Sequence, residues 1–161
     1  MKSKRIAAKE IQLIVYDFDG VMTNNTAQVD ENGVESVIVS RGDGMAVDMI
    51  RKKNIPQMII STEENKVVAA RARKLEIQVI QNCPDKKSAL IAHCRSEGID
   101  LKKVLYVGND VNDLAAMQSV GHRVCPADSH PSIKKVSQII TKARGGAGVI
   151  RELADILKIP Y

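Results

Sequence analysis

Short apolar runs alternate with amphipathic stretches along this chain. Six runs have the length and composition of strands: 13–16, 57–60, 78–80, 104–107, 123–125 and 138–140. Between most of them, apolar residues recur at helical spacing, as in 45–50, 67–75, 89–94 and 114–120. Because strands that alternate with helices usually pair in parallel, the pattern predicts an α/β fold with a Rossmann-like, doubly wound, mostly parallel sheet. Met45 and Met49, at helical spacing, are expected in its core.

One segment, residues 26–40, interrupts this alternation. It contains two β-prone runs on either side of Asn32-Gly33, a dipeptide typical of tight hairpin turns. The pattern predicts a β-hairpin flap after the first strand, and no other insertion is long enough for a separate cap domain. We therefore expect one domain over residues 1–161, with the flap at about 26–40 and a glycine-rich C-terminal segment at 144–161.

The first predicted strand ends in two carboxylates, Asp17 and Asp19, followed by Gly20. Open α/β sheets bind ligands at the carboxyl ends of their strands, so both side chains are candidates for chemistry. Two crowded negative charges repel each other, and a bound cation or a proton would relieve that repulsion. In an extended chain the two side chains point to opposite sides, and Gly20 permits the turn that would bring both to one site.

Polar side chains also follow other predicted strands. Ser61 and Thr62 follow 57–60, Lys86 opens a helical stretch, and Asn109, Asp110 and Asp113 follow 104–107. Each has a structural alternative, since hydroxyls and acidic residues cap helices and surface lysines are usually only solvated. Taken together, they predict a phosphotransfer site.

In such a site a carboxylate attacks phosphorus and a neighbouring acid protonates the leaving oxygen. A hydroxyl and a lysine hold the phosphoryl oxygens, and oxygen ligands suit Mg²⁺, which keeps several waters.

Four segments, in their order along the chain, resemble the four motifs of the haloacid dehalogenase superfamily. They are Asp17-Phe18-Asp19-Gly20-Val21-Met22-Thr23, Ser61, Lys86 and Gly108-Asn109-Asp110-Val111-Asn112-Asp113. The resemblance covers nearly the whole chain. Within the superfamily the chain is similar to a small, cap-less branch. This branch contains 3-deoxy-octulosonate 8-phosphate phosphatases, acylneuraminate 9-phosphate phosphatases and the C-terminal domain of CMP-sialic acid synthetases. The glycine-rich segment 143–152 and residues 127–131 resemble the same branch.

The resemblance implies a role for each motif residue. Asp17 matches the nucleophile, Asp19 the general acid and base, and Ser61, with Thr62 beside it, the phosphate-binding hydroxyl. Lys86 matches the lysine that offsets the charge of the intermediate. The resemblance also implies homotetramers in which each hairpin helps to cover a neighbour's site.

The implied magnesium ligands are Asp17, the backbone carbonyl of Asp19 and the residue after Gly108. That residue is normally Asp in the active phosphatases, whereas this chain has Asn109. An amide oxygen still binds Mg²⁺ but brings no charge, so the affinity should fall. Asp110 is an alternative direct ligand, and Asp113 could act through a water.

The implied function is hydrolysis of a phosphorylated 2-keto-3-deoxy sugar acid, of either the octulosonate 8-phosphate or the acylneuraminate 9-phosphate type. Glu63 with Lys74 downstream resembles the nine-carbon enzymes, and Arg41 is a candidate partner for a substrate carboxylate. The alternative is a catalytically weak or inactive oligomerisation module related to the synthetase-fused domain. A phospho-aspartate receiver fits the paired Asp17 and Asp19 poorly.

Composition narrows the partners and the compartment. The net charge of +5 is modest, and with no Trp, one Phe and three Tyr a base-stacking surface for nucleic acid is poorly supplied. No apolar run approaches membrane-spanning length, and the start of the chain does not resemble a signal peptide. Three cysteines without metal-like spacing are typical of reduced thiols, so we expect a cytoplasmic protein.

Overall fold

The computed structural model of the chain describes residues 6–160, so residues 1–5 and 161 of the expected domain lie outside the described part. Six strands form the main sheet: β1 (Leu13–Tyr16), β4 (Gln57–Ile60), β5 (Gln78–Ile80), β6 (Val104–Val107), β7 (His122–Cys125) and β8 (Ile139–Ile140). The helices are α1 (Arg41–Arg51), α2 (Lys66–Leu75), α3 (Lys86–Glu97), α4 (Leu114–Gln118), α5 (Pro131–Val136) and α6 (Val149–Ile156). Three 3₁₀ turns lie at Ala8–Glu10, Leu101–Lys103 and Val111–Asp113.

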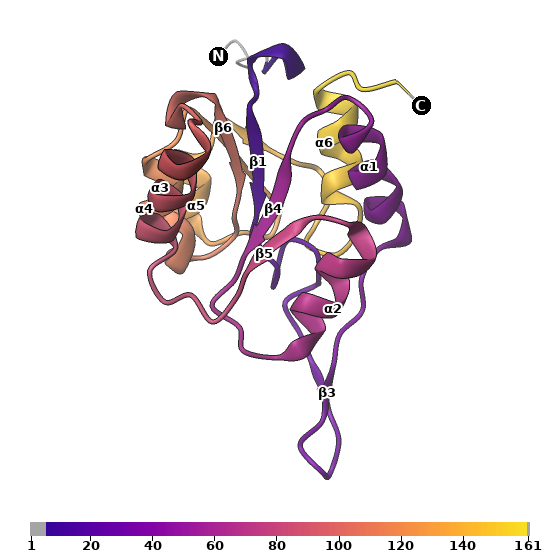
Figure 1. Cartoon of the computed structure of the whole chain (residues 1–161). Coiled ribbons are helices and arrows are strands. Elements are labelled where there is room, and N and C mark those ends of the chain that lie inside the picture. The colour runs from indigo at the N-terminus through magenta and orange to yellow at the C-terminus, as the bar shows by residue number, and fades with distance from the viewer. Residues whose placement is uncertain (1–5, 161) are drawn as a thin grey trace.

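The sheet has the order β5-β4-β1-β6-β7-β8, and every pair of neighbours is parallel. Helices α1, α2 and α6 cover one face of the sheet, and α3, α4 and α5 cover the other (Figure 1). The predicted doubly wound α/β fold is therefore confirmed. Because β1 lies at the centre, its carboxyl end faces the ends of β4 and β6, and Tyr16 is in register with Ile59 and Val107.

Two apolar clusters, one on each face, hold the sheet between its helices. Alternate residues of β1 divide between them, with Ile14 and Tyr16 in one cluster and Leu13 and Val15 in the other. All four residues of β1, β4 and β6 are buried, as expected for parallel strands covered on both faces. This burial fixes the ends of the three strands, where the polar motifs begin.

The hairpin flap forms from two short strands, β2 (Gln28–Val29) and β3 (Glu35–Ser36), which pair antiparallel. Gly33 adopts a positive φ of 75° in the turn, as the sequence predicts. The hairpin projects away from the body of the protein beyond the carboxyl ends of the strands (Figure 1). Val29, Val34 and Ile38 stay exposed, and Ile38 has 80% of its surface accessible, whereas Val37 and Val39 pack partly against the core.

Two local expectations differ from the structure. Met45 is 62% exposed rather than in the core, because α1 turns Ala46, Val47 and Ile50 inward instead. Helices α5 and α6, of six and eight residues, were not predicted from periodicity. Helix α6 is held by α1, where the buried Asp43 accepts a hydrogen bond from the backbone N–H of Arg151 at 2.9 Å.

The glycine-rich segment before α6 packs against the loop that follows β1 in the same chain. The backbone N–H of Gly146 donates to the carbonyl of Val21 at 3.0 Å, and that of Gly145 donates to Asp128 Oδ1 at 3.0 Å. A Cβ at Gly145 would lie 2.2 Å from the carbonyl oxygen of Gly20. Only glycine permits this approach of two backbones, so the segment supports the loop that carries Asp19.

Replacing this glycine therefore predicts a loss of stability. Gly145→Ala should lower the free energy of unfolding by about 1–3 kcal/mol, because neither backbone can move away easily. Gly42→Ala is the matched control, since a Cβ there would meet only Ser40 Oγ at 3.5 Å. Urea unfolding of both variants measures the difference. Equal stability of Gly145→Ala and the control would contradict the tight approach.

Candidate active site

The loop after β1 turns so that Asp17 and Asp19 face the same hollow. Gly20 makes the turn with a φ of 86°, as expected from its position. The backbone N–H of Phe18 donates to Asp17 Oδ1 at 2.8 Å. Thr23 is wholly buried, and its hydroxyl accepts from the N–H of Gly20 at 3.2 Å and lies 3.4 Å from Asp19 Oδ1. The loop thus fixes both carboxylates before any ligand binds.

Lys86 joins the ends of three structural elements. It lies at the start of α3, where Asp85 caps the helix, and it is almost completely buried. Its ammonium group donates to Asp17 Oδ1 at 2.7 Å and to Asp113 Oδ1 at 2.8 Å. A buried lysine is stable only when its charge is paired. Here one cation serves two carboxylates, from the loops after β1 and β6.

Asp113 organises the loop after β6. Its Oδ2 accepts from the backbone N–H groups of Asn109 at 2.9 Å and Asp110 at 3.3 Å. Its Oδ1 accepts from the hydroxyl of Tyr106 at 3.0 Å as well as from Lys86. A Cβ at Gly108 would lie 2.7 Å from Cβ of Asp113, so the preceding glycine is required for this arrangement.

The buried charges do not balance. Burial raises the pKa of Asp17 to about 8, and Asp113 adds to the rise, while Lys86 lowers it only in part. Burial alone would lower the pKa of Lys86, but Asp17 and Asp113 outweigh it and raise that pKa. We conclude that Lys86 stays charged between two carboxyl groups that would together carry one excess negative charge. A divalent cation beside Asp17 would favour its ionised form.

Asp19 is half-buried, and its environment favours the protonated form. Burial raises its pKa, the charge of Glu63 raises it further, and the hydrogen bond with Thr23 lowers it in part. The hairpin residue Glu35 also raises this pKa. A carboxyl group that holds its proton more tightly is suited to protonating a leaving oxygen near neutral pH.

The donor atoms beside Asp17 suit a hard metal ion. The amide oxygen of Asn109 is buried and has no hydrogen-bond partner among the described residues. Both hydrogen bonds of the Asp17 side chain are accepted by Oδ1, so Oδ2 has no partner among the described residues. In residues 6–160 no three His, Cys, Asp or Glu side chains form a metal cluster. A site of one carboxylate, one amide and backbone oxygen fits Mg²⁺, which retains several waters.

Asp110 has a structural task in this loop. Its Oδ1 accepts from the N–H of Val111 at 2.7 Å, and with Asp113 it forms a capping box at the turn Val111–Asp113. Of the two predicted alternatives for the third ligand, Asn109 is therefore the better placed, since its oxygen is free.

These groups surround a hollow of about 280 Å³ at the carboxyl edge of the sheet. Its lining consists of Asp17, Asp19, Asn25, Thr62, Asn109, Asp110, Val111 and Asn112. Thr62 reaches the hollow, whereas Ser61 is buried beside it and its Oγ accepts from the N–H of Glu63 at 3.1 Å. Helix α2 is capped by Asn65 rather than by Ser61 or Thr62. The structure thus gathers the predicted catalytic, phosphate and metal residues from four separate parts of the chain.

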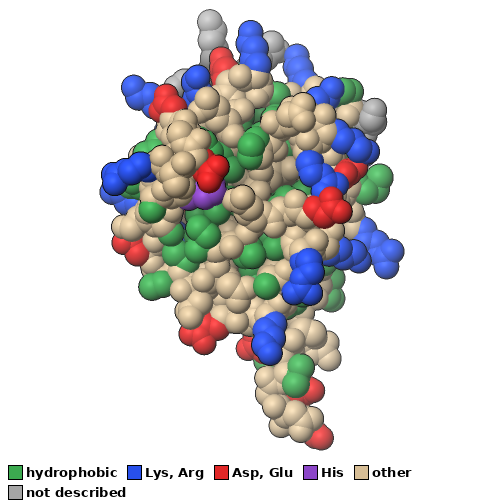
Figure 2. All heavy atoms as spheres, viewed as in Figure 1, with side chains coloured by type: hydrophobic (Ala, Val, Ile, Leu, Met, Phe, Trp, Pro, Cys, Tyr) green, Lys and Arg blue, Asp and Glu red, His purple; other side chains and the backbone are tan. Residues whose placement is uncertain are grey.

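Arg41 and Lys74 lie elsewhere. They line a second groove of about 540 Å³ between α1, α2 and α6, together with Lys52, Arg71 and Arg151. Figure 2 shows Lys and Arg side chains gathered on the side of α1 and α2, and acidic side chains on the projecting hairpin. Neither Arg41 nor Lys74 lines the hollow at Asp17. Glu63 lies close enough to Asp19 for its charge to raise the pKa of that carboxyl.

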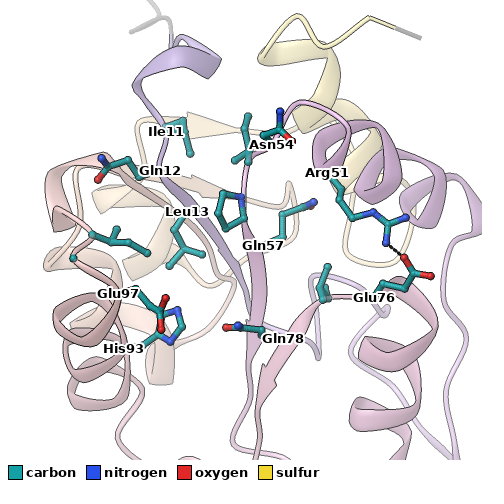
Figure 3. A pocket seen from close by; sticks show the side chains of 15 residues that line it. Ile11, Gln12, Leu13, Arg51, Asn54, Gln57, Glu76, Gln78, His93 and Glu97 are labelled. Carbon is teal, nitrogen blue, oxygen red and sulfur yellow. Dashed lines mark hydrogen bonds and ion pairs between the residues drawn. The ribbon is translucent and has the colours of Figure 1, made fainter.

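A larger hollow of about 670 Å³ lies at the opposite edge of the sheet (Figure 3). Gln12, Gln78, His93 and Glu97 line it, and an ion pair joins Arg51 and Glu76 at its side. It contains no predicted site residue and lies at the amino ends of the strands. The smaller hollow at Asp17 therefore remains the candidate active site, because it lies at the carboxyl ends of the strands and carries the predicted site residues.

Sequence reasoning missed several residues of the site. Tyr106 reads as a core residue of a strand, and its hydroxyl contact becomes visible only in three dimensions. Asn25, Asn112 and Glu35 are exposed polar residues of loops and hairpin, a type that carries no pattern in a single sequence.

Comparisons with known proteins identify the family of the chain. Residues 45–153 match the family of haloacid dehalogenase-like hydrolases. The chain is 31% identical over 151 residues to the 3-deoxy-D-manno-octulosonate 8-phosphate phosphatase KdsC of Salmonella typhi, an alignment that covers 93% of this chain and 80% of that protein. The chain belongs to the haloacid dehalogenase-like hydrolases, and the predicted phosphatase class is confirmed.

Solved structures of proteins from this family have the same fold as this chain. A HAD family hydrolase from Streptomyces avermitilis has a TM-score of 0.95 at 42% identity, covering 98% of this chain and 91% of that one. A 3-deoxy-D-manno-octulosonate 8-phosphate phosphatase from Moraxella catarrhalis, solved with magnesium, phosphate and the sugar acid, has a TM-score of 0.90 at 30% identity. That alignment covers 94% of this chain and 88% of the other.

The raised pKa of Asp17 predicts how stability depends on pH and metal. Below about pH 4 the carboxyl is protonated in both folded and unfolded chains, and the stability gained from its raised pKa is lost as pH rises through about 8. The metal-free protein should therefore melt at a lower temperature at pH 8 than at pH 6. Magnesium favours the ionised carboxylate, so it should raise the melting temperature more at pH 8.

Thermal unfolding with magnesium and with chelator at both pH values measures this. The Asp17→Asn variant is the control, since it should lose most of the difference between the two pH values. A magnesium effect of equal size at pH 6 and pH 8 in the wild type would contradict the excess buried charge.

Proposed function

We propose that the protein is a magnesium-dependent phosphatase that hydrolyses a phosphorylated 2-keto-3-deoxy sugar acid through a phosphorylated Asp17. The observation that carries this proposal is the convergence of Asp17, Lys86 and Asp113 next to the unpaired oxygen of Asn109. The substrate class comes from the octulosonate 8-phosphate phosphatases that the chain resembles over most of its length.

The residues support a two-step reaction. The carboxylate of Asp17 attacks phosphorus, and the bond between phosphorus and the sugar oxygen breaks. Asp19 donates its proton to that sugar oxygen. In the second step Asp19 takes a proton from a water, which attacks the phosphorus of phospho-Asp17. The bond between phosphorus and the Asp17 oxygen breaks, which frees the carboxylate and releases inorganic phosphate. Thr62 binds phosphoryl oxygens through its hydroxyl and its backbone N–H, and Lys86 balances the charge on Asp17.

Asp17, the backbone carbonyl of Asp19 and Asn109 would hold the magnesium ion, with Asp113 orienting the loop of Asn109. The bound ion would supply positive charge next to the transferred phosphoryl group. Asp110 belongs to the cap of the following turn in this proposal, although sequence analysis placed it among the possible ligands.

We further propose that the site is completed by a second copy in a homotetramer. Within the described residues no Lys or Arg lines the hollow, so the carboxylate of a sugar acid finds no cation there. Arg41 and Lys74 lie in the separate basic groove, and we propose that those of a neighbouring copy meet this carboxylate. The exposed apolar residues of the hairpin, Val29, Val34 and Ile38, also favour assembly.

A cytoplasmic location completes the proposal. Cys83, Cys94 and Cys125 are all buried and unpaired, as in proteins of a reducing compartment. Among the helices that the structure describes, none has the length and apolar character needed to cross a bilayer.

Removing the nucleophile tests the function directly. Asp17→Asn should reduce magnesium-dependent phosphate release from octulosonate 8-phosphate or acylneuraminate 9-phosphates by at least about 10³-fold, because an amide cannot form the intermediate. Phosphate release from a panel of sugar phosphates, with magnesium and with chelator, measures this. Asp100→Asn, a capping residue at the opposite edge of the sheet, is the control and should keep wild-type activity. Wild-type-like turnover by Asp17→Asn would contradict the mechanism.

The neutral side chain of Asn109 favours one alternative function, a catalytically weak oligomerisation module. The variant Asn109→Asp distinguishes this alternative from the phosphatase. Asn109→Asp places a negative charge where the free oxygen lies, so the affinity for magnesium should rise at least about tenfold. Calorimetric titration measures the affinity, and phosphate release measures the activity. Asp110→Asn is the control and should change the affinity far less.

The activities of the wild type and of Asn109→Asp distinguish the phosphatase from the oligomerisation module. Efficient turnover by the wild type supports the phosphatase, with Asn109 as a competent ligand. No turnover by the magnesium-loaded wild type, together with activity in Asn109→Asp, would support the weakened module. An unchanged affinity in Asn109→Asp would contradict the assignment of Asn109 as a ligand.

A further inference from the structure

The rim of the active-site hollow differs in character from its floor. The floor carries the acidic residues Asp17 and Asp19, whereas at the rim Asn25, Thr62 and Asn112 add neutral polar groups beside the carboxylate of Asp110. These three residues come from the loops after β1, β4 and β6, so three separate loops present the same chemistry around one opening. None of them takes part in the proposed metal site.

The backbone of Asn25 is held by a hydrogen bond, whereas its side chain does not contribute to holding the loop. Its neighbour Asn24 holds the loop, since Asn24 Oδ1 accepts from the N–H of Thr26 at 3.2 Å and its hydroxyl at 2.7 Å. The carboxamide of Asn25 makes no hydrogen bond in the described part of the chain. Its backbone N–H donates to Thr23 Oγ1 at 3.1 Å, and the same oxygen lies next to Asp19. Asn25 is therefore fixed relative to the catalytic acid.

Asn112 approaches the hollow from the opposite loop. Its Nδ2 lies 3.5 Å from Thr62 Oγ1, at the outer limit of a hydrogen bond. Both groups thus keep most of their hydrogen-bonding capacity, and Val111 beside them exposes 57% of its surface. Carboxamides both donate and accept, which suits hydroxyl groups, and the exposed valine suits the C–H faces between them.

We propose that Asn25 and Asn112, on either side of the phosphate-binding Thr62, form a subsite for the hydroxylated carbons next to the phosphate of the substrate. This inference rests on the proposed phosphatase function and adds how the leaving group is recognised. The hollow of about 280 Å³ has room for a phosphoryl group and a few carbons only, so the far end of a sugar acid extends beyond it. The lining contains no aromatic ring to stack on a nucleobase.

Three substrates separate this subsite from the catalytic residues. p-Nitrophenyl phosphate carries the phosphate without hydroxyls, sorbitol 6-phosphate adds a hydroxylated chain, and octulosonate 8-phosphate adds a carboxylate. The variants are Asn112→Ala and Asn25→Gly, since glycine keeps the positive φ of 64° at that position. Asn54→Gly is the matched control, with a φ of 58° at the opposite edge of the sheet.

The double variant should lose about tenfold in kcat/KM for both hydroxylated substrates, as expected for two lost hydrogen bonds. Its kcat/KM for p-nitrophenyl phosphate should change by less than about twofold, and the control should match the wild type with all three. An equal loss with p-nitrophenyl phosphate would overturn the subsite, because it would show that the residues position Asp19 instead.

The outcomes also separate the subsite from the proposed function. If the wild type hydrolyses the hydroxylated substrates and the double variant does so equally well, only the subsite is overturned. If the wild type hydrolyses p-nitrophenyl phosphate and no hydroxylated substrate, the proposed substrate class and the subsite are both overturned.

Discussion

The contact of one buried lysine with two carboxylates determines the geometry of this site. Lys86 holds Asp17 from the loop after β1 and Asp113 from the loop after β6, and Asp113 in turn fixes the backbone of Asn109 and Asp110. The position of the nucleophile and the position of the proposed metal ligand thus depend on the same ammonium group. The parallel sheet makes this possible, because it brings the carboxyl ends of β1 and β6 side by side.

Such a network is not a source of stability in itself. The desolvation of buried charges offsets most of their attraction, and here the carboxyl groups outnumber the cation. Burial and, after it, the charge of Asp113 raise the pKa of Asp17, and a bound cation would favour its ionised form. The fold maintains the arrangement by other means, chiefly the buried strands on both sides and the backbone contact between Gly145 and the loop after β1. Function and stability are therefore carried by different parts of the molecule.

The sequence was sufficient to predict the sheet and the place of the chemistry. Buried parallel strands leave continuous apolar runs, and the polar residues that follow them meet at one edge, which is why Asp17, Asp19 and Asn109 could be expected to lie together. Lys86 alone was a weak signal, since only the fold shows that it is buried. The hydroxyl contact of Tyr106 depends on how the turn Val111–Asp113 folds back over the end of β6, which no pattern along the chain records.

The positions of Arg41 and Lys74 illustrate a different limit. Spacing along a chain gives the face of a helix, but not which hollow that face borders, and these two residues border the basic groove instead of the active site. Helix α6 was missed because its eight residues follow a glycine-rich segment whose composition favours a loop. In each case the missing information is a contact between elements far apart in the sequence.

The central claim is that phosphate passes through a covalent bond to Asp17. Quenching the magnesium-loaded enzyme during turnover of a sugar acid phosphate and reducing it with borohydride would convert an aspartyl phosphate to homoserine. Mass spectrometry of the resulting peptides then locates the modification. The account predicts homoserine at residue 17, dependent on both magnesium and substrate. Phosphate release with no modification at residue 17, or with modification at another carboxylate, would contradict it.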